Sequence, residues 1–383
     1  MSLFAALPGG PDGGLDSMRR ALAELMEAGR LRAVLVMLQT RDGLGVQPAL
    51  VTKAERLGLA DPMLPVMPIH MARMASLVSQ GATEGETPTE GKIGVVGRPC
   101  ELRGIVELAK LNQLRLDDFA TIGIDCAGSF EGAAWRRWSK SDPQARHRLE
   151  ESQRAASPDA PQESYRHACT LCDTPAAWDA DLAVHWIGVE DGLLLEAREA
   201  GWLPPSAVPV EDSTTRSASL GRLETTRRAA RQQALDAMEA RMHSSPDGSP
   251  GLMLDFEACQ RCHNCTVACP ICYCKECLFR TDTFRYDPRR YFGWADRKGA
   301  ARLPGDTLTF QLTRLCHVTA SCVGCGMCTS ACPAELPVDL LFQTVARRTQ
   351  ALFDYVPGRS LQDPLPPATF ERKEFVDLGE APR

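Results

Sequence analysis

The chain has 383 residues, 44% of them hydrophobic, which is enough for a buried core and for two or more domains. The formal net charge of −6 and the lack of a basic face argue against nucleic-acid binding. The longest apolar run, residues 31–38, is too short to span a bilayer, and the opening residues do not resemble a signal peptide. We therefore expect a cytoplasmic protein without a membrane span, whose 16 cysteines bind metals rather than form disulfides.

The first elements in chain order predict an α/β unit. Residues 15–30 carry apolar side chains at helical spacing, and residues 31–38 are predicted to form a buried strand. Residues 92–97, 101–111 and 119–126 are then predicted to be strand, helix and strand. Because the connections between them are short, the two strands should lie parallel in an α/β sheet.

The middle of the chain and its end are polar. Residues 131–168 are predicted to be a surface excursion, with basic side chains that form a solvated face more often than a phosphate contact. Residues 211–243 are expected to form a long exposed helix that acts as a linker, followed by a flexible joint over 244–251. The tail from Pro357 is predicted to be a docking strap or a disordered end.

The most specific signal is a cysteine spacing, C-x2-C-x2-C-x3-C followed by proline, that occurs twice. In this motif the first three thiolates bind one cubane, and the fourth cysteine binds the other cubane. Two 4Fe-4S clusters are therefore predicted. Cluster set 1 consists of Cys259, Cys262, Cys265 and Cys332. Cluster set 2 consists of Cys322, Cys325, Cys328 and Cys269. Zinc is the alternative, although paired C-x2-C knuckles are its usual pattern.

Such clusters pass single electrons, so this part of the chain is predicted to transfer electrons from a donor to an acceptor. The spacer between the motifs holds further candidate ligands, namely Cys272, Cys274, Cys277, Cys316 and His317. They are either packed core or an additional metal site such as zinc, and the sequence leaves both interpretations open.

Four cysteines lie in the N-terminal half. Cys100 and Cys126 follow the two predicted parallel strands, so both should lie at the carboxyl edge of the sheet. Cys169 and Cys172 form a C-x2-C pair that can approach this edge. These four residues, the N-terminal set, predict a possible third cluster, whereas single cysteines at strand ends are usually structural. A cofactor would also bind at this edge.

Several segments resemble the coenzyme F420-reducing hydrogenase beta-subunit family. They are GRPCELRG, IGIDCAGSF and CTLCDTPAAWDADLAVHWIG. The order of these motifs, followed by a C-terminal two-cluster ferredoxin module, is similar to that of the formate dehydrogenase beta subunit. This second resemblance is strengthened by the segments CPICYCKEC, FRYDPRRYFGWADRKGA and SCVGCGMC. The resemblance spans about residues 10–350 and is patchier before residue 90. PGGPDGGLDS lacks the cysteine that the family usually has before its glycine pair.

The resemblance implies that the N-terminal domain binds FAD. Gly13 and Gly14 match the glycines before the first helix of the family, and Gly97, Arg98 and Pro99 match its loop over the flavin. Glycine at such positions permits close backbone approach to a phosphate or a ring. The sequence contains no G-x-G-x-x-G fingerprint, so dinucleotide binding of that type is not supported.

The fold class implied is an α/β N-terminal flavin domain plus a C-terminal α-helical dicluster ferredoxin-like domain. The boundaries are 1–204 for the flavin domain, 205–250 for a helical linker, 251–350 for the ferredoxin-type domain and 351–383 for an extended tail.

The function implied is that of an electron-transfer (beta) subunit of a multi-subunit oxidoreductase. Electrons would move between a formate dehydrogenase or hydrogenase catalytic subunit, the 4Fe-4S clusters and FAD, which serves coenzyme F420 or a heterodisulfide-reductase-type complex. A flavin can take electrons singly and pass on a hydride. Chemistry on formate or hydrogen is expected in a partner chain. The alternatives are a flavin-less iron-sulfur relay and a zinc-stabilised interaction module.

Overall fold

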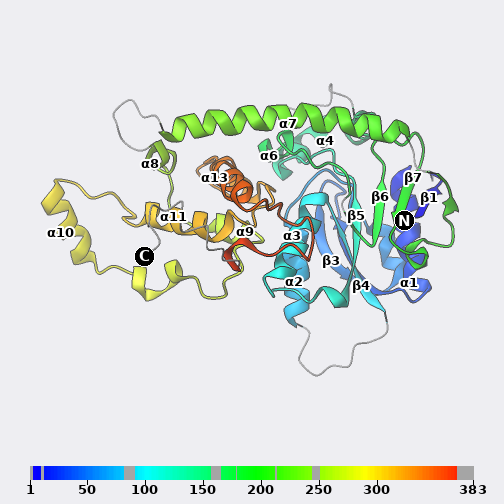
Figure 1. Ribbon diagram of the computed structural model, residues 1–383, viewed down its shortest axis with the longest axis horizontal. Helices are drawn as coiled ribbons and strands as arrows, with labels where there is room; N and C mark the ends of the chain where they lie inside the picture. Colours follow the sequence, from blue (N-terminus) through cyan, green and yellow to red (C-terminus); the bar gives the residue numbers. More distant parts are fainter. Residues whose placement is uncertain are drawn as a thin grey trace, which may run out of the picture.

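One half of the protein is built on a mixed β-sheet, and the described residues of the other half form helices and no strand (Figure 1). The computed structural model describes residues 3–9, 13–81, 91–156, 165–177, 179–211, 214–243 and 251–368. The strands are β1 (Leu3–Leu7), β2 (Leu31–Gln39), β3 (Val46–Val51), β4 (Lys92–Gly97), β5 (Phe119–Ile124), β6 (Leu182–His185), β7 (Leu193–Ala197) and β8 (Val208–Pro209).

The helices divide between the two halves, with α7 extending along both (Figure 1). Those before the cysteine-rich half are α1 (Gly14–Glu27), α2 (Met71–Gly81), α3 (Pro99–Lys110), α4 (Gly132–Ser141), α5 (Ala145–Arg154), α6 (His167–Thr170) and α7 (Thr214–His243). Those within it are α8 (Gly251–Asp255), α9 (Asn264–Ala268), α10 (Pro288–Lys298), α11 (Thr307–Val318), α12 (Met327–Ser330) and α13 (Val338–Leu352).

The sheet has the strand order β3-β2-β4-β5-β6-β7-β1-β8. Strands β2, β4, β5 and β6 are parallel, and the other neighbours pair antiparallel. The predicted strand–helix–strand unit is confirmed, because β4 pairs in parallel with β5, with Ile93 opposite Phe119 and α3 as the connection. The residues that follow β4 and β5 therefore lie at one edge of the sheet.

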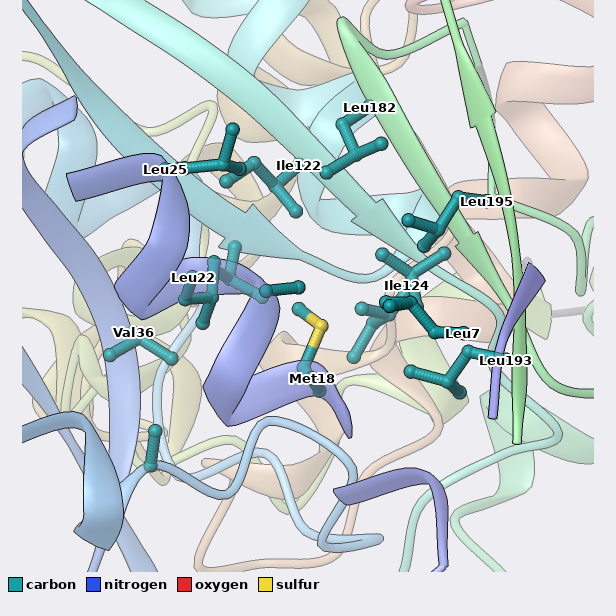
Figure 2. Close-up of a cluster of buried hydrophobic side chains, with 14 of the residues drawn as sticks. Leu7, Met18, Leu22, Leu25, Val36, Ile122, Ile124, Leu182, Leu193 and Leu195 are labelled. Atoms are coloured by element: carbon teal, nitrogen blue, oxygen red, sulfur yellow. The ribbon is translucent and has the colours of Figure 1, made fainter. Parts of the chain in front are cut away.

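Helix α1 covers one face of the sheet because its apolar side chains recur at helical spacing. Met18, Leu22 and Leu25 are buried against the strands (Figure 2). In β2 the side chains alternate between two cores, as the pleat requires. Val34 packs into the core with α1, and Leu35 packs into the core with α2 and α3 on the opposite face.

The prediction of a surface excursion over residues 131–168 is wrong for its helical part. Trp135 of α4 and Leu149 of α5 are each only 2% exposed and join the core on the α2–α3 side. The rings of Phe130 and Trp135 lie 5.7 Å apart. The short helices contain many charged residues, so their buried face has too few apolar positions to be recognised by periodicity. Residues 157–164 lie outside the described residues.

The long helix predicted over residues 211–243 is confirmed as α7 (Thr214–His243), but this helix is not exposed throughout. Leu235 and Met238 are buried, and Arg227 is 8% exposed. The helix runs along both halves of the protein, and α13 lies beside it (Figure 1). Among the described residues, no helix has both the length and the apolarity needed to cross a membrane. The predicted flexible joint falls almost entirely on residues 244–250, which lie outside the described residues.

The start of the C-terminal tail is docked against α3. The hydroxyl of Tyr355 and the backbone N–H of Gly358 both donate to Glu107 Oε1, at 2.6 and 2.8 Å. Of the two predicted behaviours, the docking strap therefore describes this part of the tail. Residues 369–383 lie outside the described residues.

Candidate metal centres

Cluster set 1 surrounds one hollow in the helical half. Its four cysteines line an atom-free space of about 350 Å³, which we call hollow 1. Cys259 and Cys262 lie in a loop with left-handed backbone at Arg261 (φ 52°) and His263 (φ 65°), and Cys265 follows on α9. Cys332 arrives from the second motif, just after α12.

Cluster set 2 surrounds a second hollow of about 430 Å³, which we call hollow 2. Three of its cysteines belong to the second motif, and Cys269 comes from the first. The loop again has two left-handed residues, Gly324 (φ 71°) and Gly326 (φ 70°). They occupy the same motif positions as Arg261 and His263, so the repeated spacing is accompanied by a repeated backbone geometry.

Two side chains of α11 donate to thiols of hollow 1. Gln311 Nε2 lies 3.4 Å from Cys259 Sγ, and Arg314 Nη1 lies 3.0 Å from Cys265 Sγ. Burial raises the pKa of Cys265 to about 11, and the guanidinium of Arg314 acts in the opposite direction. These donors stabilise a sulfur that carries negative charge, as a metal-bound thiolate does.

Hollow 2 has a carboxylate in its wall instead. Asp339 of α13 lines it and is 3% exposed. Burial is the main cause that raises the pKa values of Cys322 and Cys328, and Asp339 raises both further. Hydrogen bonds from backbone N–H groups act to lower the pKa values of two cysteines of this set. The N–H of Gly324 does so at Cys322, and that of Met327 at Cys325.

The N-terminal set converges at the carboxyl edge of the sheet. Cys100 lies in the first turn of α3, and Cys126 follows β5. Burial raises the pKa of Cys126 to about 11, with added contributions from Cys169 and Cys172. The pKa of Cys100 is raised by burial, by Glu101 and then by Cys325 of hollow 2. The second cysteine loop lies next to this set, since a Cβ at Gly326 would meet Ala168 Cβ.

Among the described residues, no three His, Cys, Asp or Glu side chains lie close enough together to hold a single metal ion. A cubane distributes four thiolates over four iron atoms, so its ligands need not converge as tightly as those of one ion. The cysteines around hollow 1 and hollow 2 range from buried at Cys265 to exposed at Cys262. They have the chemistry that this group requires, sulfur ligands together with hydrogen-bond donors.

Two arginines, of which Arg166 is buried and Arg103 half-buried, bind the second cysteine loop to the sheet half. Arg166, at the N-cap of α6, donates from Nη2 to the carbonyl of Cys325 at 3.0 Å and from Nε to Ser330 Oγ at 2.9 Å. Arg103 of α3 donates to the carbonyl of Val323 at 2.7 Å. Sequence reasoning missed both residues, since their only signal is that each lies three residues from a cysteine of the N-terminal set.

A hydrogen-bond network at the end of β6 is centred on Asp125, the residue before Cys126. Asp125 accepts from the backbone N–H of Trp186 at 3.1 Å, lies 3.1 Å from His185 Nδ1 and pairs with Arg216 of α7. Hydrogen bonds to Asp125 and Glu196 raise the pKa of His185 against the effect of burial. No sequence pattern predicted this network.

The further candidate ligands in the spacer differ in their surroundings. Cys272 lies beside Cys269, whose hydrogen bond raises its pKa, and Cys277 packs with the cluster around Phe279. Cys274 and Cys316 are exposed. For Cys272 and Cys277 these contacts favour the packing interpretation over an additional site with His317.

The first glycine pair assigned to the flavin is explained by packing. Gly13 has a left-handed backbone (φ 63°) at the N-cap of α1. A Cβ at Gly14 would lie 2.9 Å from Leu193 Cδ2. Neither residue lines a hollow described here.

The second segment assigned to the flavin is also packed. Arg98 is 5% exposed and donates to the carbonyls of Leu64 and Val66 at 2.8 and 3.0 Å. Gly97 ends β4, and Pro99 is the first residue of α3. Strands β5, β6 and β7 lie between β4 and β1, so this segment and the glycine pair share an edge of the sheet but are not neighbours.

An open hollow lies between α7 and the segment that carries Tyr165 and Thr170. Its lining includes Tyr165, Thr170, Arg222 and Arg227. Arg227 also donates to the carbonyl of Cys172 at 3.5 Å. An aromatic ring, hydroxyls and guanidinium groups form a donor set that suits an aromatic, anionic ligand.

No family model matches the chain. The chain is 24% identical over 317 residues to the F420-dependent formate dehydrogenase subunit beta of Methanocaldococcus jannaschii, covering 72% of this chain and 76% of that one. It is 25% identical over 380 residues to the F420-dependent formate dehydrogenase 1 subunit beta of Methanococcus maripaludis, covering 90% of each. A chain in a solved structure of the F420-reducing NiFe hydrogenase complex from Methanosarcina barkeri aligns with a TM-score of 0.44 and 13% identity, over 64% of this chain and 94% of that one.

Proposed function

We propose, because the chain resembles formate dehydrogenase beta subunits over most of its length, that it is an electron-transfer subunit of a multi-subunit oxidoreductase. Its donor or acceptor would be a formate dehydrogenase or hydrogenase catalytic chain, in which the chemistry on formate or hydrogen takes place. Coenzyme F420 or a heterodisulfide-reductase-type complex would lie at the other end of the path.

The observation that carries this proposal is the succession of three cysteine sets. Arg314 contacts a thiol of hollow 1 and also lines hollow 2. Arg166 joins hollow 2 to the N-terminal set, because its Nη2 donates to the carbonyl of Cys325 and its own carbonyl accepts from the backbone N–H of Cys169 at 2.8 Å. Clusters at these positions would form a continuous path from the helical half to the carboxyl edge of the sheet.

In this proposal cluster set 1 and cluster set 2 hold two 4Fe-4S clusters, and the N-terminal set holds a third. The clusters would supply one-electron redox chemistry. The protein's own part is to hold the thiols in place and to donate hydrogen bonds to sulfur. Gln311 and Arg314 do this at hollow 1, and the backbone N–H groups of Gly324 and Met327 do it at hollow 2.

FAD would supply the exchange between single electrons and a hydride. We place it in the open hollow between α7 and the segment that carries Tyr165 and Thr170, because that hollow adjoins Cys172 through Arg227. Gly13, Gly14, Gly97, Arg98 and Pro99 remain assigned by resemblance alone.

Anaerobic purification with metal, sulfide and flavin analysis tests the proposal. Two clusters require about eight irons and as many acid-labile sulfides per chain, and three clusters require about twelve. An acid-extracted flavin supports the FAD, whereas iron and sulfide without flavin support the flavin-less relay. Zinc without acid-labile sulfide would remove the electron-transfer function and leave the zinc-stabilised module.

A further inference from the structure

Arg314 lies in the wall between hollow 1 and hollow 2. It belongs to α11 and is 4% exposed. Its Nη1 donates to Cys265 Sγ at 3.0 Å and to Gln311 Oε1 at 3.1 Å, and its guanidinium carbon lies 4.7 Å from the ring centre of Phe342. The side chain is therefore held in one position, with its charge directed at the sulfur ligands.

No carboxylate forms an ion pair with Arg314 in the part of the chain that the structure describes. A buried cation without a partner is destabilising by several kcal/mol, so a compensating negative charge is needed. Thiolate sulfurs that bind a cluster would supply it, since metal-bound cysteines carry negative charge. Cys265 first, and then Cys272, Cys269 and Cys328, raise the pKa of Arg314 against the effect of burial.

These sulfurs belong to both hollows. Cys265 is a ligand of cluster set 1, whereas Cys269 and Cys328 belong to cluster set 2. The direct hydrogen bond goes to hollow 1. One fixed positive charge therefore acts on both sets, and its action is stronger on the first.

We infer that Arg314 sets the reduction potentials of the two clusters and raises that of the cluster in hollow 1 more than that of its neighbour. This inference rests on the proposed function, since it needs both clusters. Reduction adds one electron, and so one negative charge, to a cluster, and no proton has to move. A buried guanidinium at hydrogen-bond distance stabilises that added charge.

The test is a redox titration of the anaerobically purified chain, reduced with dithionite and monitored by EPR. Arg314→Gln removes the charge and keeps a donor, and Arg314→Lys keeps the charge. We expect Arg314→Gln to lower the reduction equilibrium constant of the hollow 1 cluster roughly tenfold, about 59 mV for a one-electron couple, with a smaller change at hollow 2. Arg314→Lys should retain more than half of the wild-type stabilisation.

Arg347→Gln is the matched control. Arg347 lies in the same half, but its charge is already balanced by Asp236 and Glu239 of α7. Its removal should leave both potentials unchanged. The inference is overturned if Arg314→Gln leaves the potentials as they are, or if Arg314→Lys shifts them as far as Arg314→Gln does.

Pulsed EPR on the wild-type protein decides the question if Arg314→Gln does not assemble its clusters. Labelling with 15N-arginine should change the nitrogen coupling in the signal of the hollow 1 cluster, because Nη1 contacts its ligand sulfur. Absence of any arginine coupling refutes the inference while the clusters remain. Absence of iron and acid-labile sulfide in the wild type refutes the proposed function itself.

Discussion

Hollow 1 and hollow 2 share a cysteine spacing and a loop geometry, but different charges surround them. Gln311 and Arg314 donate to thiols of hollow 1, whereas the buried carboxylate of Asp339 lines hollow 2. A cation favours the reduced form of a nearby cluster, and a carboxylate disfavours it. A repeated motif thus fixes where a cluster can bind, while side chains outside the motif determine how readily it accepts an electron. We expect the cluster in hollow 1 to be reduced first.

The two hollows also differ in their neighbours. Arg103 and Arg166 bind the loop of hollow 2 to the sheet half, next to the N-terminal set. Hollow 1 lies on the other side of Arg314, in the part of the helical half that includes α11. In the proposed function, a cluster in hollow 1 would exchange electrons with a partner chain, and a cluster in hollow 2 with the sheet half.

The largest effect is expected for Cys332→Ser, which breaks the exchange of ligands between the motifs. Cys332 lines hollow 1 although it belongs to the second motif. We expect the hollow 1 cluster to be lost or altered, with about four fewer irons per chain if it is lost, and the EPR signal of the hollow 2 cluster to persist. Cys316→Ser, at an exposed cysteine outside both sets, should change neither. Loss of the hollow 2 signal alone would contradict the assignment.

Gly326→Ala should show that the two cysteine loops differ in whether they tolerate a side chain at this position. In the loop of hollow 1, His263 occupies the equivalent left-handed position (φ 65°). A Cβ at Gly326 (φ 70°) would lie 2.3 Å from Ala168 Cβ, so the substitution should push α6 away. We expect a loss of unfolding free energy beyond the roughly 1–3 kcal/mol of left-handed strain, measured by anaerobic thermal denaturation.

Gly299→Ala is the control for this substitution. Gly299 has the same kind of backbone (φ 75°), and a Cβ there meets nothing within 4 Å. If Gly326→Ala is no more destabilising than Gly299→Ala, the contact with Ala168 does not restrict the loop.

Asp339→Asn should reduce the difference between the reduction potentials of the clusters in hollow 1 and hollow 2. Removing the carboxylate from hollow 2 should raise the potential of its cluster by up to about 59 mV, a tenfold change in the reduction equilibrium constant, and move hollow 1 less. Redox titration by EPR measures both. Asp296→Asn, on the exposed helix α10, should shift neither potential. A lowered potential at hollow 2 would show that Asp339 does not act through its charge.

The arrangement of the cysteines is where the sequence was most informative. The spacing within each motif is local, so a short loop and the helix after it determine which sulfurs can face one space. The strand–helix–strand unit of β4, α3 and β5 was predicted for the same reason, since its connections are short and its strands are apolar.

The side chains that surround the cysteines could not be found in this way. Arg314 contacts a cysteine 49 residues earlier, and Arg166 binds a carbonyl 159 residues later. No pattern in the sequence marks such contacts, because they depend on how whole elements pack. The glycines assigned to the flavin illustrate the same limit, as the order of strands in the sheet, which separates Gly13 from Gly97, is not the order in the chain.

The smallest effect is expected at the N-terminal set, which is supported by a buried ion network instead of a repeated loop. His185 is 2% exposed, and Asp125 with Glu196 raises its pKa above the ordinary value of about 6.5. A raised pKa in the folded state stabilises the fold fully below about pH 6.5, and the contribution disappears as the pH rises through the folded-state value. In the His185→Gln variant, the backbone amides of this network should therefore lose protection against hydrogen exchange chiefly below that pH. Hydrogen exchange at the amides of Trp186 and Ile187, which donate to Asp125, measures this, corrected for intrinsic rates. A difference between wild type and variant that grows as the pH rises would mean that His185 is neutral in the network.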